Sequence, residues 1–379
     1  MFNILNSIYM NNRKIRVAIT HGDTNGIGYE LIFKTFADQE MMELCTPIIY
    51  GSPKIAAYHR KALDIQANFS IINSADEAQD DRINLLTCFD DEVKVDLGVP
   101  TEESGLASVK SLDCAMTDYR EGLYDVLVMA PVCASNIKVG NLTFESLDNY
   151  LQTCLGDGKE TMTLFLNDFM HVALVANDLS MKEAVSSVTD VKIINKAAVL
   201  YQTLKRDFCI SNPRIAVLAL NPKADGVEET EIIVPAITKL SDAGMSAYGP
   251  YQAEEFFGTG QYDAFDGILA MYYDQALLPF KTLTVGEGVC SVVNLPLVCT
   301  KTNYSPEFAK AGQGIIDENP FRQAVYLAID SYRNRFNYDE SLTNPLPKLY
   351  HERREDRDRS RFNAPNRQEW GGQKEQIEE

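Results

Sequence analysis

Short apolar segments alternate with longer amphipathic segments along most of the chain. Residues 16–20 and 46–50 are short and apolar, which is typical of strands buried on both faces of a sheet. Further segments of this kind lie at 125–130, 171–176, 214–220, 267–271 and 291–298. Between them, helices are predicted at 29–36, 54–63, 184–188, 196–205, 229–243 and 320–336. The alternation predicts an α/β protein with a largely parallel sheet that helices cover on both faces.

The C-terminal segment has a different character. Residues 351–379 hold seven Lys/Arg and eight Asp/Glu with little that is apolar, so a disordered charged tail is expected over 345–379. The 379-residue chain has a formal net charge of −19, and nearly all of it precedes this tail. A chain this acidic is a poor candidate for binding nucleic acid, which needs Lys and Arg against the phosphates.

Other features bear on where the protein works. No stretch of about 18 apolar residues exists, so no membrane-spanning helix is expected. The first 16 residues lack the apolar core and cleavage site of a signal peptide. The eight Cys are scattered without a C-x-x-C pair, which favours reduced thiols and a cytoplasmic protein.

A glycine-rich turn follows the first predicted strand and reads HGDTNGIG over 21–28. Its candidate ligand-facing residues are Gly22, Asp23, Gly26 and Gly28. Ligands of open α/β sheets bind beyond the carboxyl ends of strands, and glycine lets the backbone approach a ligand closely. The spacing is neither G-x-G-x-x-G nor a Walker A loop. A phosphate cradle and a tight strand-to-helix turn therefore both remain open.

Two further segments, 218–226 and 270–281, run from a predicted strand into polar residues. The second of them contains Asp274 and Lys281. Such side chains at strand ends suit acid–base or anion-binding roles, and they equally suit solvated loop charges.

Several motifs in order resemble one known family. They are RVAITHGDTNGIGYEL, VMAPV, HVALVA, PRIAVLALNP, GPYQAEEFF, YDQALLPFKTL and AGQGIID, and they span about residues 14–335. The chain resembles the 4-hydroxythreonine-4-phosphate dehydrogenases. The resemblance implies an α/β/α sandwich like that of isocitrate and isopropylmalate dehydrogenases, with two subdomains around a cleft. The first subdomain is expected to comprise residues 14–130 and 280–340, and the second to comprise residues 131–279.

The resemblance also implies the chemistry. Family members oxidise 4-phosphohydroxythreonine with NAD and then release carbon dioxide, a step in pyridoxal phosphate synthesis. A divalent metal polarises the oxygen that becomes a ketone. The resemblance further implies a homodimer whose active sites use both subunits, with a phosphorylated small molecule as ligand.

This sequence departs from the family's pattern at the metal site. Three His ligate the metal in the family, and Asp178, Lys223 and Tyr273 stand at the aligned positions. A lysine ammonium has no free lone pair and repels a divalent cation. We therefore expect no metal. The hypothesis is that the Lys223 ammonium takes its place and pairs with Asp178, with the Tyr273 hydroxyl completing the cluster.

The aligned substrate positions depart as well. They hold Leu147, Asp148, Cys290 and Cys299. A carboxylate at 148 would repel a phosphate, and the family's arginine at 299 would have clamped an anion with two hydrogen bonds. For the two Cys, burial as small apolar side chains is favoured over a new thiol site.

Other positions agree with the family. Asp274 and Lys281 are kept, as is the turn with Gly22, and Glu254 replaces a family aspartate. We take Asp274, Lys281 and Glu254 as the catalytic candidates by this resemblance.

The four His offer few further groups for chemistry. His21 is either a general base or a hydrogen-bonding residue of the turn, His171 is expected to be structural, and His59 is expected to face solvent on its helix. Two functions stay open. One is the NAD-dependent dehydrogenase of the family, and the other is a non-catalytic or substrate-shifted paralogue that acts as a binding or regulatory dimer.

Overall fold

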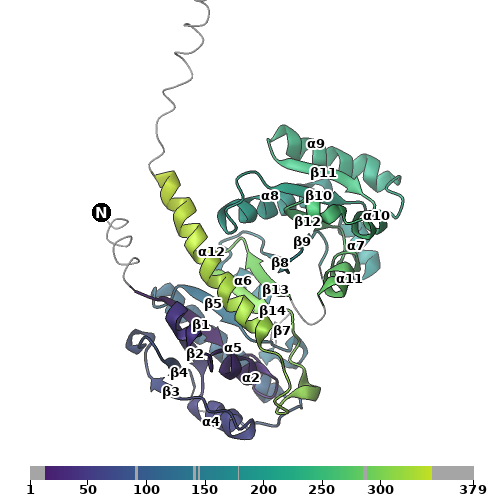
Figure 1. Cartoon of the computed structure of the whole chain (residues 1–379). Coiled ribbons are helices and arrows are strands. Elements are labelled where there is room, and N and C mark those ends of the chain that lie inside the picture. Colours follow the sequence, from purple (N-terminus) through teal and green to yellow (C-terminus); the bar gives the residue numbers. More distant parts are fainter. Residues whose placement is uncertain are drawn as a thin grey trace, which may run out of the picture. The chain divides into compact units, whose positions relative to one another are not determined.

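A twelve-stranded sheet runs through the part of the chain that the computed structural model describes, which is residues 13–89, 93–139, 142–143, 146–177, 179–284 and 288–343. Its order is β11-β10-β12-β9-β8-β13-β14-β5-β1-β2-β4-β3 (Figure 1). The strands are β1 (Ile15–Thr20), β2 (Cys45–Gly51), β3 (Phe69–Ile72), β4 (Ile83–Thr87), β5 (Val126–Met129), β8 (Met162–Leu166), β9 (His171–Leu174), β10 (Arg214–Leu218), β11 (Ser246–Tyr251), β12 (Gly267–Ala270), β13 (Val289–Val293) and β14 (Val298–Thr302). A separate two-stranded sheet pairs β6 (Lys138–Val139) with β7 (Leu142–Thr143).

The sheet is parallel on both sides and antiparallel in its middle. Strand β1 pairs in parallel with β2 and β5, and β10 pairs in parallel with β11 and β12. The antiparallel pairs are β9 with β8, β8 with β13, and β13 with β14. The predicted α/β class with a largely parallel sheet is thereby confirmed.

One predicted strand is wrong. Residues 291–298 were expected as a single strand, and the chain instead turns between β13 and β14, which pair as a hairpin. Asn294 adopts a left-handed φ of 67°, a conformation that asparagine tolerates better than most residues. Pro296 cannot donate a ladder hydrogen bond. Because apolar residues lie on both sides of this turn, the sequence predicted one continuous strand.

Helices cover both faces of the sheet, in two layers. They are α2 (Gly28–Thr35), α3 (Glu40–Leu44), α4 (Pro53–Ala62), α5 (Glu102–Arg120), α6 (Leu147–Leu155), α7 (Met181–Ser187), α8 (Asp190–Arg206), α9 (Val234–Asp242), α10 (Ala253–Gly258), α11 (Tyr273–Leu283) and α12 (Asn319–Thr343). A π-helical turn, Glu229–Ile233, leads into α9. The predicted α/β/α sandwich is therefore confirmed.

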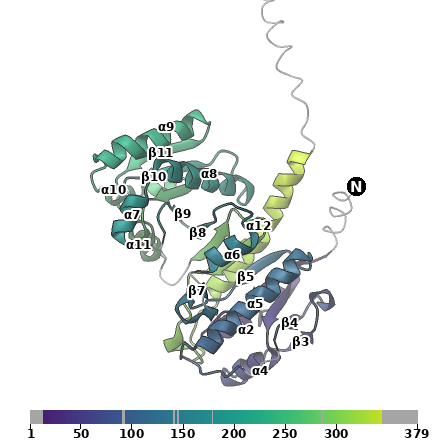
Figure 2. The same cartoon turned by 180° about the vertical axis from the view of Figure 1, so that it is seen from behind.

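The half of the sheet around β1 shows how the layers arise. Val17 and Ile19 face a core shared with α2, α4 and α12, whereas Ala18 between them faces a core shared with α5 and α6. Successive strand side chains point to opposite faces, so a fully apolar strand serves both layers. Figure 2 shows α5 and α6 from the side that is turned away in Figure 1.

The half around β10 repeats the arrangement. Ile215 and Val217 face a core with α8 and α9, and Ala216 faces a core with α10 and α11. Arg335 of α12 reaches this half through a buried ion pair with Asp207, which caps the C-terminus of α8, at 2.6 Å between Nε and Oδ1. No helix among the described residues is long and apolar enough to cross a bilayer.

The limits of the two subdomains, 14–130 with 280–340 and 131–279, stay a prediction. The predicted tail over 345–379 lies outside the described residues.

Candidate functional site

A cavity of about 210 Å³ lies where several strands of the sheet end. Its walls come from the segment after β5, the start of α6, strand β8, the loop after β9, the start of α11, and the β13–β14 hairpin. The lining residues are Ala130, Pro131, Val132, Leu147, Asp148, Thr163, Phe165, Asn177, Tyr273, Cys290, Lys301, Thr302, Asn303 and Tyr304. Strand ends of an open α/β sheet are where ligands bind, so this cavity is the candidate site.

An ion pair forms part of the wall of the cavity. Lys301 Nζ donates to Asp148 Oδ1 at 2.6 Å, and Thr163 Oγ1 donates to the second carboxylate oxygen. The two charged side chains keep 21% and 20% of their surface exposed. Ser146 caps α6 by accepting from the Asn149 backbone N–H at 3.1 Å, which fixes Asp148 in the first turn. A carboxylate there is also favoured by the helix dipole.

The two cysteines at aligned substrate positions are both buried on one face of the hairpin, at 2% and 0% exposure. Cys290 is opposite Lys301 in the β13–β14 ladder and lines the cavity. Cys299 precedes Lys301 by two residues and is buried in the core beneath α5 and α6. Burial raises the pKa of each thiol to about 12, against the opposing effect of Lys301 at Cys290 and of Arg335 at Cys299. Both are therefore thiols at neutral pH, unlike a reactive cysteine.

The glycine turn lies against the cavity wall without lining the cavity. Gly22 has φ +70°, and a Cβ there would lie 2.3 Å from the Pro131 carbonyl oxygen. Gly26 would place a Cβ 2.9 Å from a backbone oxygen, and Gly28 would place one 2.0 Å from the His21 carbonyl oxygen. The glycines are thus required by chain-to-chain packing, which agrees with the tight-turn interpretation.

Asp23 holds this turn together. It is 1% exposed, and its Oδ1 accepts from the Asn25 backbone N–H at 2.9 Å while its Oδ2 accepts from Asn136 Nδ2 at 2.8 Å. A carboxylate buried and bonded in this way is part of the fold.

The prediction for His59 is wrong, because this side chain is buried at 1% exposure. Its Nε2 donates to the Thr24 carbonyl at 2.7 Å, and its ring stacks on Tyr29 at 4.9 Å between centroids. His59 follows Ile55 by four residues, so the two share a helix face, and that spacing was the available signal. His21 also stacks on Tyr29, with the ring centroids 5.2 Å apart. Burial lowers the pKa of both imidazoles to about 4.

Comparison with known proteins identifies the family. The family model described as pyridoxal phosphate biosynthetic protein PdxA matches residues 43–328. The chain belongs to this family. A 4-hydroxythreonine-4-phosphate dehydrogenase of Bacteroides thetaiotaomicron is 46% identical over 360 residues, covering 94% of this chain and 99% of the relative. Another, of Sulfurihydrogenibium sp., is 31% identical and covers 83% of this chain and 98% of the relative.

Solved structures of PdxA proteins show the same fold. The 4-hydroxythreonine-4-phosphate dehydrogenase of Klebsiella pneumoniae aligns with a TM-score of 0.74 at 21% identity, covering 85% of this chain and 99% of that chain. The enzyme of Burkholderia phymatum gives 0.69 at 24% identity, covering 84% and 99%. These structures confirm the fold, and the family model together with the 46% identical relative confirms the family that the motifs predicted.

The three catalytic candidates of the PdxA resemblance do not line the cavity. Asp274 and Lys281 are exposed residues of α11, and Glu254 is an exposed residue of α10. Seven residues separate the first two, which places them about 10 Å apart along the helix axis.

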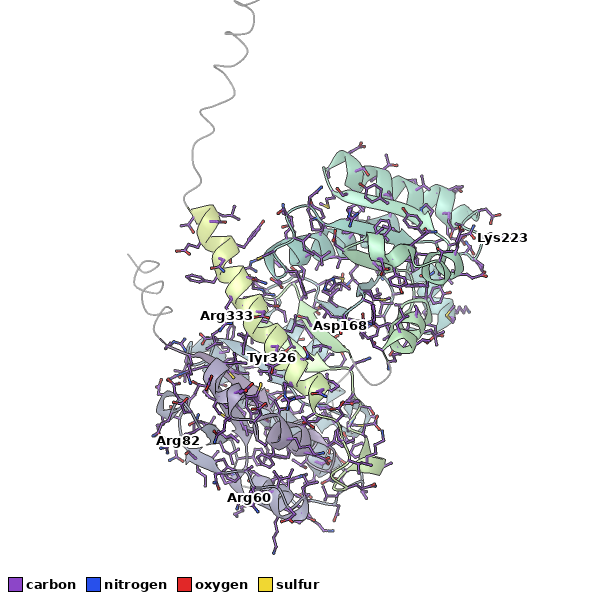
Figure 3. The ribbon with its side chains drawn as sticks, viewed as in Figure 1. Arg60, Arg82, Asp168, Lys223, Tyr326 and Arg333 are labelled. Atoms are coloured by element: carbon purple, nitrogen blue, oxygen red, sulfur yellow. The ribbon has the colours of Figure 1, made fainter. Side chains whose placement is uncertain are left out.

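The described residues do not fit the divalent metal of the family. Lys223 lies in the loop after β10 with its side chain exposed (Figure 3), and its carbonyl accepts from Gln252 Nε2 at 3.0 Å. Tyr273 is 39% exposed and lines the cavity. Within the described residues, no group of three or more His, Cys, Asp or Glu could hold a metal ion. Asp178 lies outside those residues, so its pairing with Lys223 stays a prediction.

The structure therefore brings together four of the aligned positions and adds groups that the sequence did not single out. Leu147, Asp148, Tyr273 and Cys290 share the cavity. The polar side chains that were missed are those of Thr163, Asn177, Lys301, Thr302, Asn303 and Tyr304. Lys301 follows Cys299 by two residues in a strand, so the two-residue period placed it on the same face.

Proposed function

We propose that this chain is a substrate-shifted member of the PdxA family that binds a small polar metabolite in the cavity around Asp148 and Lys301. The proposal includes the loss of metal-dependent oxidation of 4-hydroxythreonine 4-phosphate. The observation that carries it is the Asp148–Lys301 pair in the cavity wall. A phosphate dianion entering this cavity meets the Asp148 carboxylate, which repels it. The Lys301 ammonium beside that carboxylate is already neutralised by it, so the repulsion stays uncompensated in a partly desolvated site.

The substituted metal positions support the same proposal. Lys223 and Tyr273 offer an ammonium and a phenol, which are poor ligands for a divalent cation. Without such an ion, the charge that develops on a substrate oxygen during oxidation has no Lewis acid to stabilise it.

The second candidate is the reaction named for the relatives, the NAD-dependent oxidation of 4-hydroxythreonine 4-phosphate. The 46% identity over 94% of the chain favours it. In that case NAD is the hydride acceptor, and Asp274 and Lys281 are the groups that would hold and return protons.

The assembly and the compartment are proposals that rest on the family and on the cysteine pattern. We propose a homodimer in the cytoplasm. Analytical ultracentrifugation of the full chain tests the dimer, and a monomer at all concentrations would contradict it.

An assay of NAD reduction separates the two candidates. The purified full chain is given 4-hydroxythreonine 4-phosphate with NAD, alone and with Zn²⁺ or Mg²⁺, beside the Bacteroides relative as positive control. We expect no turnover and no stoichiometric divalent ion by metal analysis. Turnover at about 1 per second or faster, the range of ordinary enzymes, would overturn the proposal.

A gain-of-function variant sharpens this test. The triple substitution Asp178→His, Lys223→His and Tyr273→His supplies imidazoles at the aligned metal positions. Metal binding by the triple variant would show that the lost ligands, and not the scaffold, account for the missing ion.

A further inference from the structure

We infer that Cys88 and Cys114 form an oxidation-sensitive dithiol site, which hydrogen peroxide converts to a disulfide between the end of β4 and α5. This inference goes beyond the proposed function and does not depend on it. Both cysteines are free and partly buried. Neither stands at a metal or substrate position of the family resemblance.

Two hydrogen bonds to the end of β2 bring the cysteines together in the fold. Cys88 follows β4, and its backbone N–H donates to the Gly51 carbonyl at 2.9 Å. On α5, the Ser111 hydroxyl donates to the carbonyl of Tyr50, the neighbour of Gly51, at 2.6 Å. Cys114 follows Ser111 by three residues, so the two share a helix face. Both cysteines therefore lie over the end of β2, although 26 positions separate them in the sequence.

The two side chains meet at the margin of one core. Both pack against the apolar cluster that residues of β2, β4 and α5 share, on the side of the sheet seen in Figure 2. The thiols are hydrogen-bonded to each other. Both keep part of their surface exposed, whereas Cys290 and Cys299 are buried. A small oxidant can reach the pair, and the sulfurs must move only from hydrogen-bond contact to the about 2.05 Å of a disulfide.

The contact makes the two thiols chemically unequal. A hydrogen bond from Cys88 stabilises a thiolate at Cys114 and lowers the pKa of that thiol, against the opposing effect of burial. The same hydrogen bond, together with burial, raises the pKa of Cys88. The thiolate is the form that peroxide oxidises, so Cys114 reacts first and Cys88 is the resolving thiol.

The oxidation consists of two displacements. In the first, the Cys114 thiolate attacks one oxygen of hydrogen peroxide, an S–O bond forms, the O–O bond breaks, and hydroxide leaves. In the second, the Cys88 sulfur attacks the Cys114 sulfur, the S–S bond forms, the S–O bond breaks, and a second hydroxide leaves. The protons of the two thiols convert both hydroxides to water. The two thiols lose two electrons in all, and one molecule of peroxide gains them.

Peptide mapping of the reduced full chain after exposure to hydrogen peroxide tests the inference. Unreacted thiols are alkylated, and the digest is analysed by mass spectrometry without reductant. We expect a disulfide between Cys88 and Cys114 as the main cross-link, which dithiothreitol reverses, as a reducing compartment also would. The same treatment in concentrated urea should give a mixture of pairings, because the fold no longer holds the two thiols together.

Two variants assign the order of the steps. Cys88→Ser removes the resolving thiol, so Cys114 should accumulate as a sulfenic acid that dimedone labels. Cys114→Ser removes the thiolate, so oxidation of Cys88 should slow at least tenfold. Cys209→Ser is the matched control, because Cys209 is an exposed cysteine outside the pair. This control should form the disulfide at the rate of the unaltered chain, and thermal melts confirm that every variant is folded.

Two results would overturn the inference. One is the absence of the Cys88–Cys114 cross-link from the folded chain at a peroxide concentration that oxidises Cys209. The other is the same yield of this cross-link in the folded chain and in urea. Neither result concerns the turnover of 4-hydroxythreonine 4-phosphate, so a failure of this inference is distinguishable from a failure of the proposed function.

Discussion

Two regions near the same strand ends use a carboxylate in opposite ways. In the glycine turn, Asp23 is 1% exposed, and both of its oxygens accept hydrogen bonds from the chain itself. In the cavity, Asp148 is 20% exposed and shares its wall with Lys301. An acidic residue at a strand end is therefore no sign of a ligand site by itself. Its burial and the identity of its partners decide whether it holds the fold or faces a ligand.

The comparison also separates a region fixed by packing from one that is open to a ligand. In the turn motif at 21–28, backbone atoms pack closely against the glycines. Asp148 and Cys290 lie in the wall of the cavity, where the packing leaves space. We therefore expect substitutions in the turn to act on stability, and substitutions in the cavity to act on binding.

The largest effect is expected for Gly28→Ala. The new Cβ would lie 2.0 Å from the His21 carbonyl oxygen, so the backbone at the start of α2 must move. We expect a loss of more than about 4 kcal/mol in the free energy of unfolding, measured by urea denaturation. Gly258→Ala in α10 is the control, because a Cβ there meets nothing within 4 Å. Equal stability of the two variants would contradict the packing role of the turn.

The next effect is the acid sensitivity of the turn region. Burial lowers the pKa of His21 and of His59 from 6.5 to about 4 in the folded chain. The unfolded chain binds these protons near pH 6.5, so the free energy of unfolding falls as the pH falls from 6.5 to 4. At about 1.4 kcal/mol per pKa unit, each imidazole contributes up to about 3 kcal/mol to this loss.

Urea denaturation at a series of pH values measures this slope. His59→Gln removes one titrating group, and its amide can still donate to the Thr24 carbonyl. The variant should show a shallower fall between pH 6.5 and 4. A slope unchanged by the substitution would show that this imidazole does not titrate as described.

Most of the fold could be predicted because its signals are local. The apolar segment at 16–20 became β1, and the helical period at 229–243 became a π-turn followed by α9. The turn at Asn294 was missed because apolar residues on both sides masked it. The face of α4 that carries His59 was misjudged although Ile55, four residues earlier, marks the buried face.

The candidate site could be predicted only in part, for a physical reason. Alignment to the family pointed to Asp148 and Cys290, but Lys301 pairs with Asp148 across 153 residues of chain. Such a pairing depends on the sheet order, which a single sequence does not specify. The same limit hid that Cys290 lines the cavity whereas Cys299 packs in the core beneath α5 and α6, although the two share one sheet face.

A moderate effect is expected for Asp23→Ala. The substitution leaves the buried Asn25 backbone N–H without its acceptor and removes one acceptor of the Asn136 amide, which still donates to the Thr101 carbonyl. Each unsatisfied buried donor costs about 1–3 kcal/mol, so we expect a loss of about 3 kcal/mol in the free energy of unfolding. Chemical denaturation measures it, and a loss below about 1 kcal/mol would mean that water replaces the carboxylate.

The smallest effect on stability is expected for Asp148→Ala, the counterpart of Asp23→Ala in the cavity. The Lys301 side chain is about a fifth exposed, so water can solvate its ammonium once the carboxylate is gone. Partly exposed ion pairs contribute about 1 kcal/mol or less, and we expect a loss of that size. A double-mutant cycle with Lys301→Ala isolates the coupling between the two side chains. If Asp148→Ala instead destabilises the chain as much as Asp23→Ala does, the pair belongs to the fold, and the contrast between the two regions disappears.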